Sequence, residues 1–393
     1  MAPRPPRVAL VTYSTKPRGG VVHTLHLAEA LQALGQPVHV FALGDPGQGF
    51  YRSSGVPHTV VPAPPWAPTL EERVWRNVDA LTEALEGAAG DFDLLHVQDC
   101  IAARAAVRVR DAGLPVKVVR TVHHVDDFTT PALIECQRRS IVDPDRVLVV
   151  SDYWRRLLRR EYGVEAEVVT NGVDARRFAR ADGRARARLR GRLGLGDGFL
   201  YLTVGGIEPR KNSLALIEAL AVVRARLGSS PRLVVVGGHS FQDHAAYREM
   251  VLDRARELGL RVGGADGDVL LPGTVPDAQL PDWYHAADVF VFPSLKEGWG
   301  LAVLEAMAAG LPVIASDIPV FREYLEPGRG VLLVPPEDRD ALASTMARLA
   351  TDPELRASLA RQGPEVAAAY RWERCGRQHL ALYRRLLEGV DGP

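Results

Sequence analysis

The chain has 393 residues, which is enough for two domains with hydrophobic cores of their own and excludes a small disulfide- or metal-stabilised scaffold. Hydrophobic residues make up 47% of the sequence and charged residues 24%, a composition that excludes disordered and fibrous proteins. The 48 lysines and arginines equal the 48 aspartates and glutamates, so the formal charge is zero and no overall field attracts nucleic acid or anionic lipid. Any anion that the protein binds must therefore be held by local groups.

The three cysteines, Cys100, Cys136 and Cys375, form no C-x-x-C pair, which favours a reducing cytoplasm over a redox motif or a zinc site. The apolar run at residues 8–11 is far shorter than the core of a signal peptide. No segment approaches the roughly 18 apolar residues of a membrane helix. We therefore expect a cytoplasmic protein, with peripheral contact at the inner face of the membrane left open.

Strand-like apolar runs alternate with helical patterns along the first half of the chain. These runs begin at residues 8, 38, 93, 116, 146 and 164. Helical apolar spacing occupies residues 23–35 and 102–113, the first of them ending at a glycine. Strands that alternate with helices predict a parallel α/β sheet. An arginine-rich segment at residues 176–198 has no strand pattern and predicts a linker with a short helix.

The same alternation starts again in the second half. Strand-like runs begin at residues 199, 232, 268, 288, 312 and 331. Helices are predicted at residues 212–228, 245–259, 278–287, 301–310 and 353–390. Two Rossmann-like halves with separate sheets follow, and open α/β sheets bind ligands at the carboxyl ends of their strands.

Residues 293–317, PSLKEGWGLAVLEAMAAGLPVIASD, join a buried strand to a helix through a glycine-punctuated loop. The unpaired amides where that helix begins, at Leu301, suit a phosphate. Glu305 lies about one turn beyond Gly300, roughly 7 Å along the axis, where a carboxylate suits a ribose diol better than a phosphate. Taken alone, Glu297 can be a solvated loop residue, and Glu305 is better explained as an ion-paired helix residue than as a ligand of a ribose.

The segment EGWGLAVLE resembles the Glu, seven residues, Glu signature of retaining glycosyltransferases of family 4, which have the GT-B fold. Other segments resemble further motifs of that family in the same order: residues 18–31, 120–128, 149–158, 168–178, 204–212 and 271–294. The resemblance implies an α/β protein of two Rossmann-like domains facing each other across a cleft. We expect an acceptor-side domain at residues 1–176, a donor-side domain at 177–370, and a helix at 371–393 that packs back on the first domain.

The resemblance also implies the roles of individual residues. Catalytic roles fall on His123, Lys211 and Glu297, with His123 near the reacting sugar and Glu297 facing its hydroxyls. Donor binding falls on Gly19, Gly20, Arg210, Lys211, Gly298, Trp299, Gly300, Leu301 and Glu305. A flexible ammonium after a Gly-Gly turn suits a phosphate oxygen, which agrees with the role implied for Lys211.

The sequence departs from the family pattern at two positions. Many relatives have Gly-Arg-Leu where this chain has Gly205-Gly206-Ile207, so the usual first arginine is absent and compensation by Arg210 stays open. Trp299 stands where phenylalanine is common.

Several residues have structural explanations as good as the functional ones. His124, Asp126 and Asp127 suit turn capping as well as acceptor binding, and Asn171-Gly172 suits a hinge. Before comparison with the family, Gly19-Gly20 is equally well explained as a plain turn, and His123 is better explained as a structural histidine.

Other chemistries are less well supported. The Asp-x-Asp strings at 91–93 and 266–268 each precede a strand, where aspartate is common in turns, so no metal is expected. The chain lacks a P-loop, and its glycines do not complete a G-x-G-x-x-G fingerprint, which disfavours NTPases and dinucleotide oxidoreductases. The arginine cluster at 152–160 fits a solvated helix face better than a lipid-docking one.

These observations predict a retaining hexosyltransferase-type enzyme (EC 2.4) that moves a sugar from a nucleotide-diphosphate donor to an acceptor hydroxyl. The acceptor class stays open among glycans, lipids and small molecules, and nucleic acid is not expected as a partner. The alternatives are a nucleotide-sugar epimerase of the same fold and a non-catalytic nucleotide-sugar-binding protein.

Overall fold

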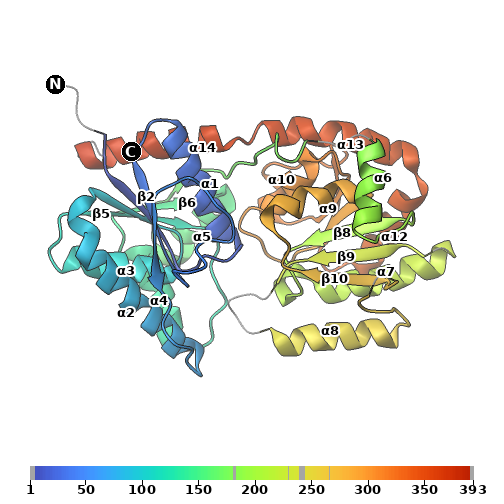
Figure 1. The fold of residues 1–393 in the computed structure, drawn as a ribbon, viewed down its shortest axis with the longest axis horizontal. Coiled ribbons are helices and arrows are strands. Elements are labelled where there is room, and N and C mark those ends of the chain that lie inside the picture. The colour runs from blue at the N-terminus through green and yellow to red at the C-terminus, as the bar shows by residue number, and fades with distance from the viewer. Residues whose placement is uncertain (1–4, 180–182, 229, 239–243, 265, 390–393) are drawn as a thin grey trace. The chain divides into compact units, whose positions relative to one another are not determined.

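The computed structural model describes residues 5–179, 183–228, 230–238, 244–264 and 266–389. The chain divides into two compact units, each with its own parallel sheet (Figure 1). Unit 1 consists of Met1–Gly172 with Trp372–Pro393, and unit 2 consists of Val173–Arg371. The division falls within the predicted hinge motif, four residues before the expected boundary, and the last helix belongs to unit 1.

Unit 1 is built on a sheet with the strand order β3-β2-β1-β4-β5-β6-β7, all parallel in its described residues. Its strands are β1 (Val8–Thr12), β2 (Val38–Gly44), β3 (His58–Pro62), β4 (Leu94–Val97), β5 (Lys117–Val122), β6 (Arg146–Val149) and β7 (Glu167–Val168). Its helices are α1 (Gly19–Ala33), α2 (Leu70–Ala88), α3 (Cys100–Asp111), α4 (Pro131–Val142), α5 (Asp152–Tyr162) and α14 (Trp372–Glu388), with a 3₁₀ turn at Ala89–Asp91. The sequence analysis did not predict β3, α2 or α4.

Unit 2 repeats this plan with the order β10-β9-β8-β11-β12-β13, again parallel. Its strands are β8 (Leu200–Val204), β9 (Arg232–Val236), β10 (Val269–Gly273), β11 (Val289–Phe292), β12 (Val313–Ser316) and β13 (Val331–Val334). Its helices are α6 (Gly183–Arg192), α7 (Ser213–Leu227), α8 (Ala245–Glu257), α9 (Leu280–Ala286), α10 (Leu301–Ala308), α11 (Pro319–Arg322), α12 (Arg339–Thr351) and α13 (Pro353–Ala368), with 3₁₀ turns at Pro209–Lys211 and Asp277–Gln279.

Each sheet reverses its strand order at one place, between β1 and β4 in unit 1 and between β8 and β11 in unit 2. Such a switch point is where open α/β sheets leave a crevice for ligands, because the connections diverge to opposite faces. The loops that follow these strands carry the candidate residues of both units.

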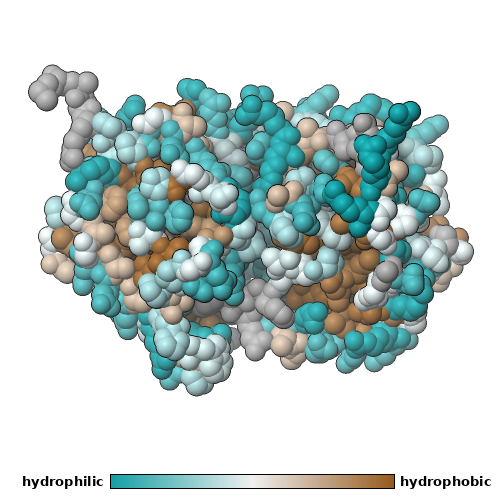
Figure 2. Space-filling model, viewed as in Figure 1, coloured by the Kyte–Doolittle hydropathy of each residue, from teal (hydrophilic) through white to brown (hydrophobic). Residues whose placement is uncertain are grey.

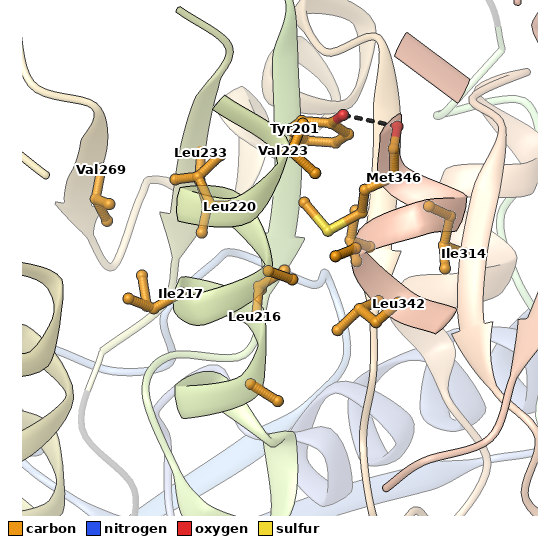
Figure 3. Close-up of a cluster of buried hydrophobic side chains, with 14 of the residues drawn as sticks. Tyr201, Leu216, Ile217, Leu220, Val223, Leu233, Val269, Ile314, Leu342 and Met346 are labelled. Atoms are coloured by element: carbon orange, nitrogen blue, oxygen red, sulfur yellow. Dashed lines mark hydrogen bonds between the residues drawn. The ribbon is translucent and has the colours of Figure 1, made fainter. Parts of the chain in front are cut away.

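Each unit has a separate apolar core. In unit 2, α7 and α12 pack side chains such as Leu220 and Met346 against the sheet, and the hydroxyl of Tyr201 donates a 2.8 Å hydrogen bond to the Met346 carbonyl (Figure 3). In unit 1, α14 packs on α1 so closely that a Cβ at Gly376 would lie 3.1 Å from Leu34. Hydrophilic residues cover much of the visible surface of both units (Figure 2).

Candidate active site

Lys211 lies in the loop between β8 and α7, in unit 2. Its Nζ atom is 2.6 Å from Oε1 of Glu297 and 4.2 Å from the centroid of the Phe292 ring. The chain turns sharply before it: Gly205 has φ +134°, and a Cβ there would lie 3.0 Å from Cε of Lys211. A residue with a side chain at 205 would therefore push the lysine away from this position. Burial, aided by Arg210, lowers the pKa of Lys211 to about 8 against the opposing effect of Glu297.

Arg210 lies between two carboxylates. Its Nη1 is 3.2 Å from Oε1 of Glu297, and its Nε is 3.1 Å from Oε2 of Glu208. The backbone connects the same two loops, because the amide of Leu295 donates to the Arg210 carbonyl at 2.8 Å. The two loops at the switch point of unit 2 thus bring both cations to one carboxylate.

Glu297 follows β11 and is 7% exposed. Burial alone would raise the pKa of this carboxyl, but the charges of Lys211 and Arg210 hold it below its ordinary value. Glu297 is therefore an anion at neutral pH with two cationic partners.

The missing arginine at position 206 has a steric explanation. Gly206 has φ +78°, and a Cβ there would lie 2.7 Å from the carbonyl oxygen of Gly238, at the end of β9. Gly237 approaches even more closely from the other side, since a Cβ there would lie 2.4 Å from the Gly206 amide nitrogen. Two backbones in contact leave no room for a side chain, so Arg210 and Lys211 are the cations that this loop presents to the site.

The glycine loop after Glu297 ends in the first turn of α10. Gly300 caps the helix with φ +91°, and a Cβ there would lie 2.6 Å from the Phe321 ring. The Trp299 side chain is buried and stacks on Tyr324 at 4.4 Å, while its carbonyl accepts a 2.6 Å hydrogen bond from the Tyr324 hydroxyl. This packing fixes the loop of Gly298, Trp299 and Gly300 directly before Leu301, the first residue of α10. The first amides of a helix have no intrahelical acceptor and suit an anion.

Glu305 lies one turn further along α10 and is partly exposed. The hydroxyl of Tyr284, a buried residue of α9, donates a 2.7 Å hydrogen bond to Oε2 of Glu305. Burial and the charge of Glu305 both raise the pKa of Tyr284 well above its usual range, so Tyr284 stays a donor. Tyr284 was not found by the sequence analysis, because nothing in residues 278–287 distinguishes it from a core aromatic residue.

The candidate residues of unit 1 meet where α1 begins. Gly19 and Gly20 are the first two residues of α1, and a Cβ at Gly20 would lie 3.7 Å from Cδ2 of His123. His123 follows β5, and its Nε2 lies 3.1 Å from Oε1 of Gln98, which follows β4. The ring of His23 in α1 packs edge-on against it with centroids 4.7 Å apart. Burial, together with the nearby charges of His23 and Arg120, lowers the pKa of His123 well below its ordinary value, so the imidazole is neutral at pH 7.

The residues with competing explanations have mostly structural contacts. His124 lies 3.3 Å from a carboxylate oxygen of Asp126, while the backbone of Asp126 is held in its turn by two hydrogen bonds with the Gln137 side chain. Asp127 is exposed. Asn171 is buried, and its Oδ1 lies 2.9 Å from Nδ1 of His23. His23 and Gln98, which position His123, were also missed, because their partners are distant in sequence.

In each Asp-x-Asp string, the second aspartate accepts hydrogen bonds from the backbone and side chain of an arginine. Asp93 accepts hydrogen bonds from the Arg7 amide and guanidinium, and Asp268 accepts the corresponding bonds from Arg261. Within the described ranges, no three His, Cys, Asp or Glu side chains are grouped to hold a metal ion.

The arginines of α5 lie on an exposed helix face. Trp154 and Leu158 point into the core of unit 1, and the arginines pair with acidic neighbours, as in the 3.0 Å contact of Arg159 with Glu165. In the part of the chain that the structure describes, no helix combines the length and the apolar character needed to cross a bilayer.

Comparison with known proteins agrees with this geometry. Residues 17–177 match the family Glycosyltransferase Family 4, and residues 186–366 match Glycosyl transferases group 1. The D-inositol 3-phosphate glycosyltransferase of Acidothermus cellulolyticus is 31% identical over 98% of this chain and 91% of the relative. The phosphatidyl-myo-inositol mannosyltransferase of Mycolicibacterium smegmatis is 30% identical over 96% of this chain and 93% of the relative.

Solved structures show the same architecture. Sucrose-phosphate synthase from Thermosynechococcus elongatus has a TM-score of 0.81 at 24% identity, covering 98% of this chain and 100% of that one. Anabaena HepE in complex with UDP and glucose has a TM-score of 0.79 at 18% identity, covering 96% and 99% of the two chains. The chain therefore belongs to glycosyltransferase family 4 and is a hexosyltransferase-type glycosyltransferase with the GT-B fold.

Proposed function

We propose that the protein transfers a hexose from a nucleotide-diphosphate sugar to an acceptor hydroxyl with retention of the anomeric configuration. The observation that carries the proposal is the pairing of Lys211 and Arg210 with the buried Glu297, beside the first turn of α10. Two cations and a helix N-terminus suit a diphosphate. Anabaena HepE, which shares the fold, was solved with UDP-glucose, and this supports a nucleotide-sugar donor.

On the donor side, Lys211, Arg210 and the amides of residues 298–301 bind the diphosphate and stabilise the charge that develops as it leaves. Glu305 accepts hydrogen bonds from the ribose hydroxyls, and Tyr284 fixes the orientation of its carboxylate. Glu297 faces the hydroxyls of the transferred sugar once Lys211 turns to the phosphate.

For the residues of unit 1, the proposed roles are that the amides of Gly19 and Gly20 bind the donor phosphates and that the neutral His123 hydrogen-bonds the reacting sugar. The bond from the anomeric carbon to the phosphate oxygen breaks, and a bond to the acceptor oxygen forms on the same face. The acceptor proton passes to the leaving phosphate, so the step needs neither a covalent carboxylate nor a metal. Addition of EDTA should therefore leave the rate unchanged.

The acceptor belongs to the polyol class in this proposal. The similar proteins from Acidothermus and Mycolicibacterium are named for D-inositol 3-phosphate and for phosphatidyl-myo-inositol. Inositol 3-phosphate and phosphatidylinositol are therefore the first acceptors to test. The second of these requires peripheral contact with a membrane.

The first test is thermal unfolding with UDP, GDP, ADP and their common sugar conjugates. A ligand at about 100 times its dissociation constant stabilises the native state by about 2.7 kcal/mol. One base family should give this shift in the wild type, and Glu305→Ala should lose it. Glu257→Ala, which removes an exposed glutamate of α8, is the matched control and should keep it.

The second test identifies the reaction by its products. Mass spectrometry should find hexose on the acceptor, and NMR should find the donor's anomeric configuration in the product. An inverted product would overturn the retaining mechanism. Epimerised donor without transfer would indicate an epimerase, and binding without nucleotide release would indicate a non-catalytic protein.

A further inference from the structure

Trp66 has the most exposed large hydrophobic side chain in the described part of the chain. It exposes 73% of its surface, and the next is Ile134 at 48%. It stands in the segment Pro-Ala-Pro-Pro-Trp-Ala-Pro, residues 62–68, which begins at the last residue of β3. Prolines restrict the backbone before folding, and the following Ala67 is fully buried, which anchors the segment. The restricted backbone therefore keeps the indole of Trp66 exposed to solvent.

This segment lies at the carboxyl ends of the strands, where the other candidate residues of unit 1 also lie. All strands of the sheet are parallel, so the loop after β3 lies at the carboxyl ends of the strands, as do the start of α1 with Gly20 and the loop with His123. Hydrogen bonds connect neighbouring loops: the Ala63 amide donates to the Gly44 carbonyl at 2.9 Å, and the Tyr51 amide donates to the Thr15 carbonyl at 3.0 Å. The loops after β1, β2 and β3 thus form one connected surface.

The charge next to Trp66 argues against a membrane as the occupant. Helix α2 begins at Leu70 and carries five acidic residues against two arginines. An exposed tryptophan that docks on an anionic bilayer is normally flanked by basic residues, because these are attracted to the lipid headgroups. The acidic residues of α2 would repel an anionic lipid surface, whereas they would not repel an uncharged ligand.

We propose that Trp66 is a stacking platform for the ring of a cyclic polyol or sugar acceptor. The carbon face of such a ring is apolar and fits the flat indole, while its hydroxyls remain available to water and to the reaction. The inference rests on the proposed function, since it assigns a binding residue to the acceptor of that reaction. Trp66 contacts the acceptor and takes no part in donor binding.

The test uses the full chain labelled with 5-fluorotryptophan and followed by ¹⁹F NMR. The chain has six tryptophans, and Trp66→Phe identifies the resonance of residue 66 by its loss. The probes are myo-inositol, methyl α-D-mannopyranoside and the open-chain polyol D-mannitol, with phosphatidylglycerol vesicles as a separate arm. A ring polyol should shift the Trp66 resonance to saturation, whereas mannitol and the vesicles should not. Ile134→Ala, which removes an exposed apolar residue of α4, should leave the shift unchanged.

Three results would overturn the inference: no ring polyol shifts the resonance, mannitol shifts it equally, or the vesicles broaden it. For whichever ring accepts hexose, Trp66→Ala should raise the acceptor KM about ten-fold, as expected for loss of one aromatic contact. Stabilisation by nucleotides should be unchanged in this variant. That measurement separates the two proposals, because absence of nucleotide binding in the wild type would defeat the proposed function while the NMR result still decides the role of Trp66.

Discussion

The rate at low donor concentration should fall as the pH rises through about 8, because Lys211 then loses its proton. Burial, aided by Arg210, lowers the pKa of this lysine from 10.5 to about 8, although Glu297 opposes the change. In the proposed function, the donor diphosphate binds the protonated form of Lys211. Above that pKa the protonated fraction falls about ten-fold for each pH unit, and kcat/KM should fall with it.

Nucleotide release measured from about pH 6 to about pH 10 gives both kinetic constants, since kcat/KM reports the free enzyme and kcat the bound complex. If the diphosphate binds as proposed, its negative charge beside Lys211 raises the pKa of the lysine, so kcat should hold to a higher pH than kcat/KM. The matched variant is Lys211→Arg, whose guanidinium stays charged throughout and should flatten the kcat/KM profile. His123 does not titrate in this range, because its pKa lies well below the ordinary value. If Lys211→Arg shows the same fall, or if the wild type shows none, Lys211 is not the group whose ionisation controls donor binding.

Three further predictions concern packing and orientation. Tyr284→Phe removes the 2.7 Å hydrogen bond to Glu305 and should weaken nucleotide binding by about 1 kcal/mol in a thermal-shift titration, whereas unchanged affinity would remove its orienting role. Gly206→Ala should destabilise the protein by about 1–3 kcal/mol more than Gly35→Ala, because both glycines have φ +78° but only at 206 does the new Cβ meet another atom within 4 Å; equal melting temperatures would contradict this. Tyr383→Phe removes the hydroxyl that lies 2.6 Å from Nδ1 of buried His96. This variant should lower the free energy of unfolding, measured in urea, by about 1–3 kcal/mol, and an unchanged unfolding midpoint would show that the hydrogen bond contributes little.

The sequence was most informative where one local pattern determines one local structure. The glycines and the helix after Glu297 predicted the loop and the start of α10, and the apolar runs predicted most strands of both sheets. Residues 58–62 were not predicted as β3, because β3 is an edge strand with little burial and its pattern is weak. Residues 70–88 were not predicted as α2, although the buried Val74, Val78, Leu81 and Leu85 recur at helical spacing.

Contacts between distant segments explain what the sequence left unresolved. Lys211 and Glu297 are 86 residues apart, and only the fold shows that they form one ion pair. Nothing near Tyr284 indicates that its hydroxyl meets Glu305. The absence of an arginine at 206 was visible in the sequence, whereas its cause, the close approach of Gly238, is not.

The placement of α14 affects the order in which the protein can fold during synthesis. Unit 2 is one continuous stretch of chain, so all of its residues leave the ribosome before the helix at Trp372–Glu388 does. Unit 1 needs that helix, which covers α1 and supplies a partner to buried His96. At about 5–20 residues per second, the first-made unit waits on the order of ten seconds or more for its last element. Until α14 is synthesised, the apolar surface of unit 1 that this helix will cover stays exposed and can bind chaperones, although the sheet of unit 1 is synthesised first.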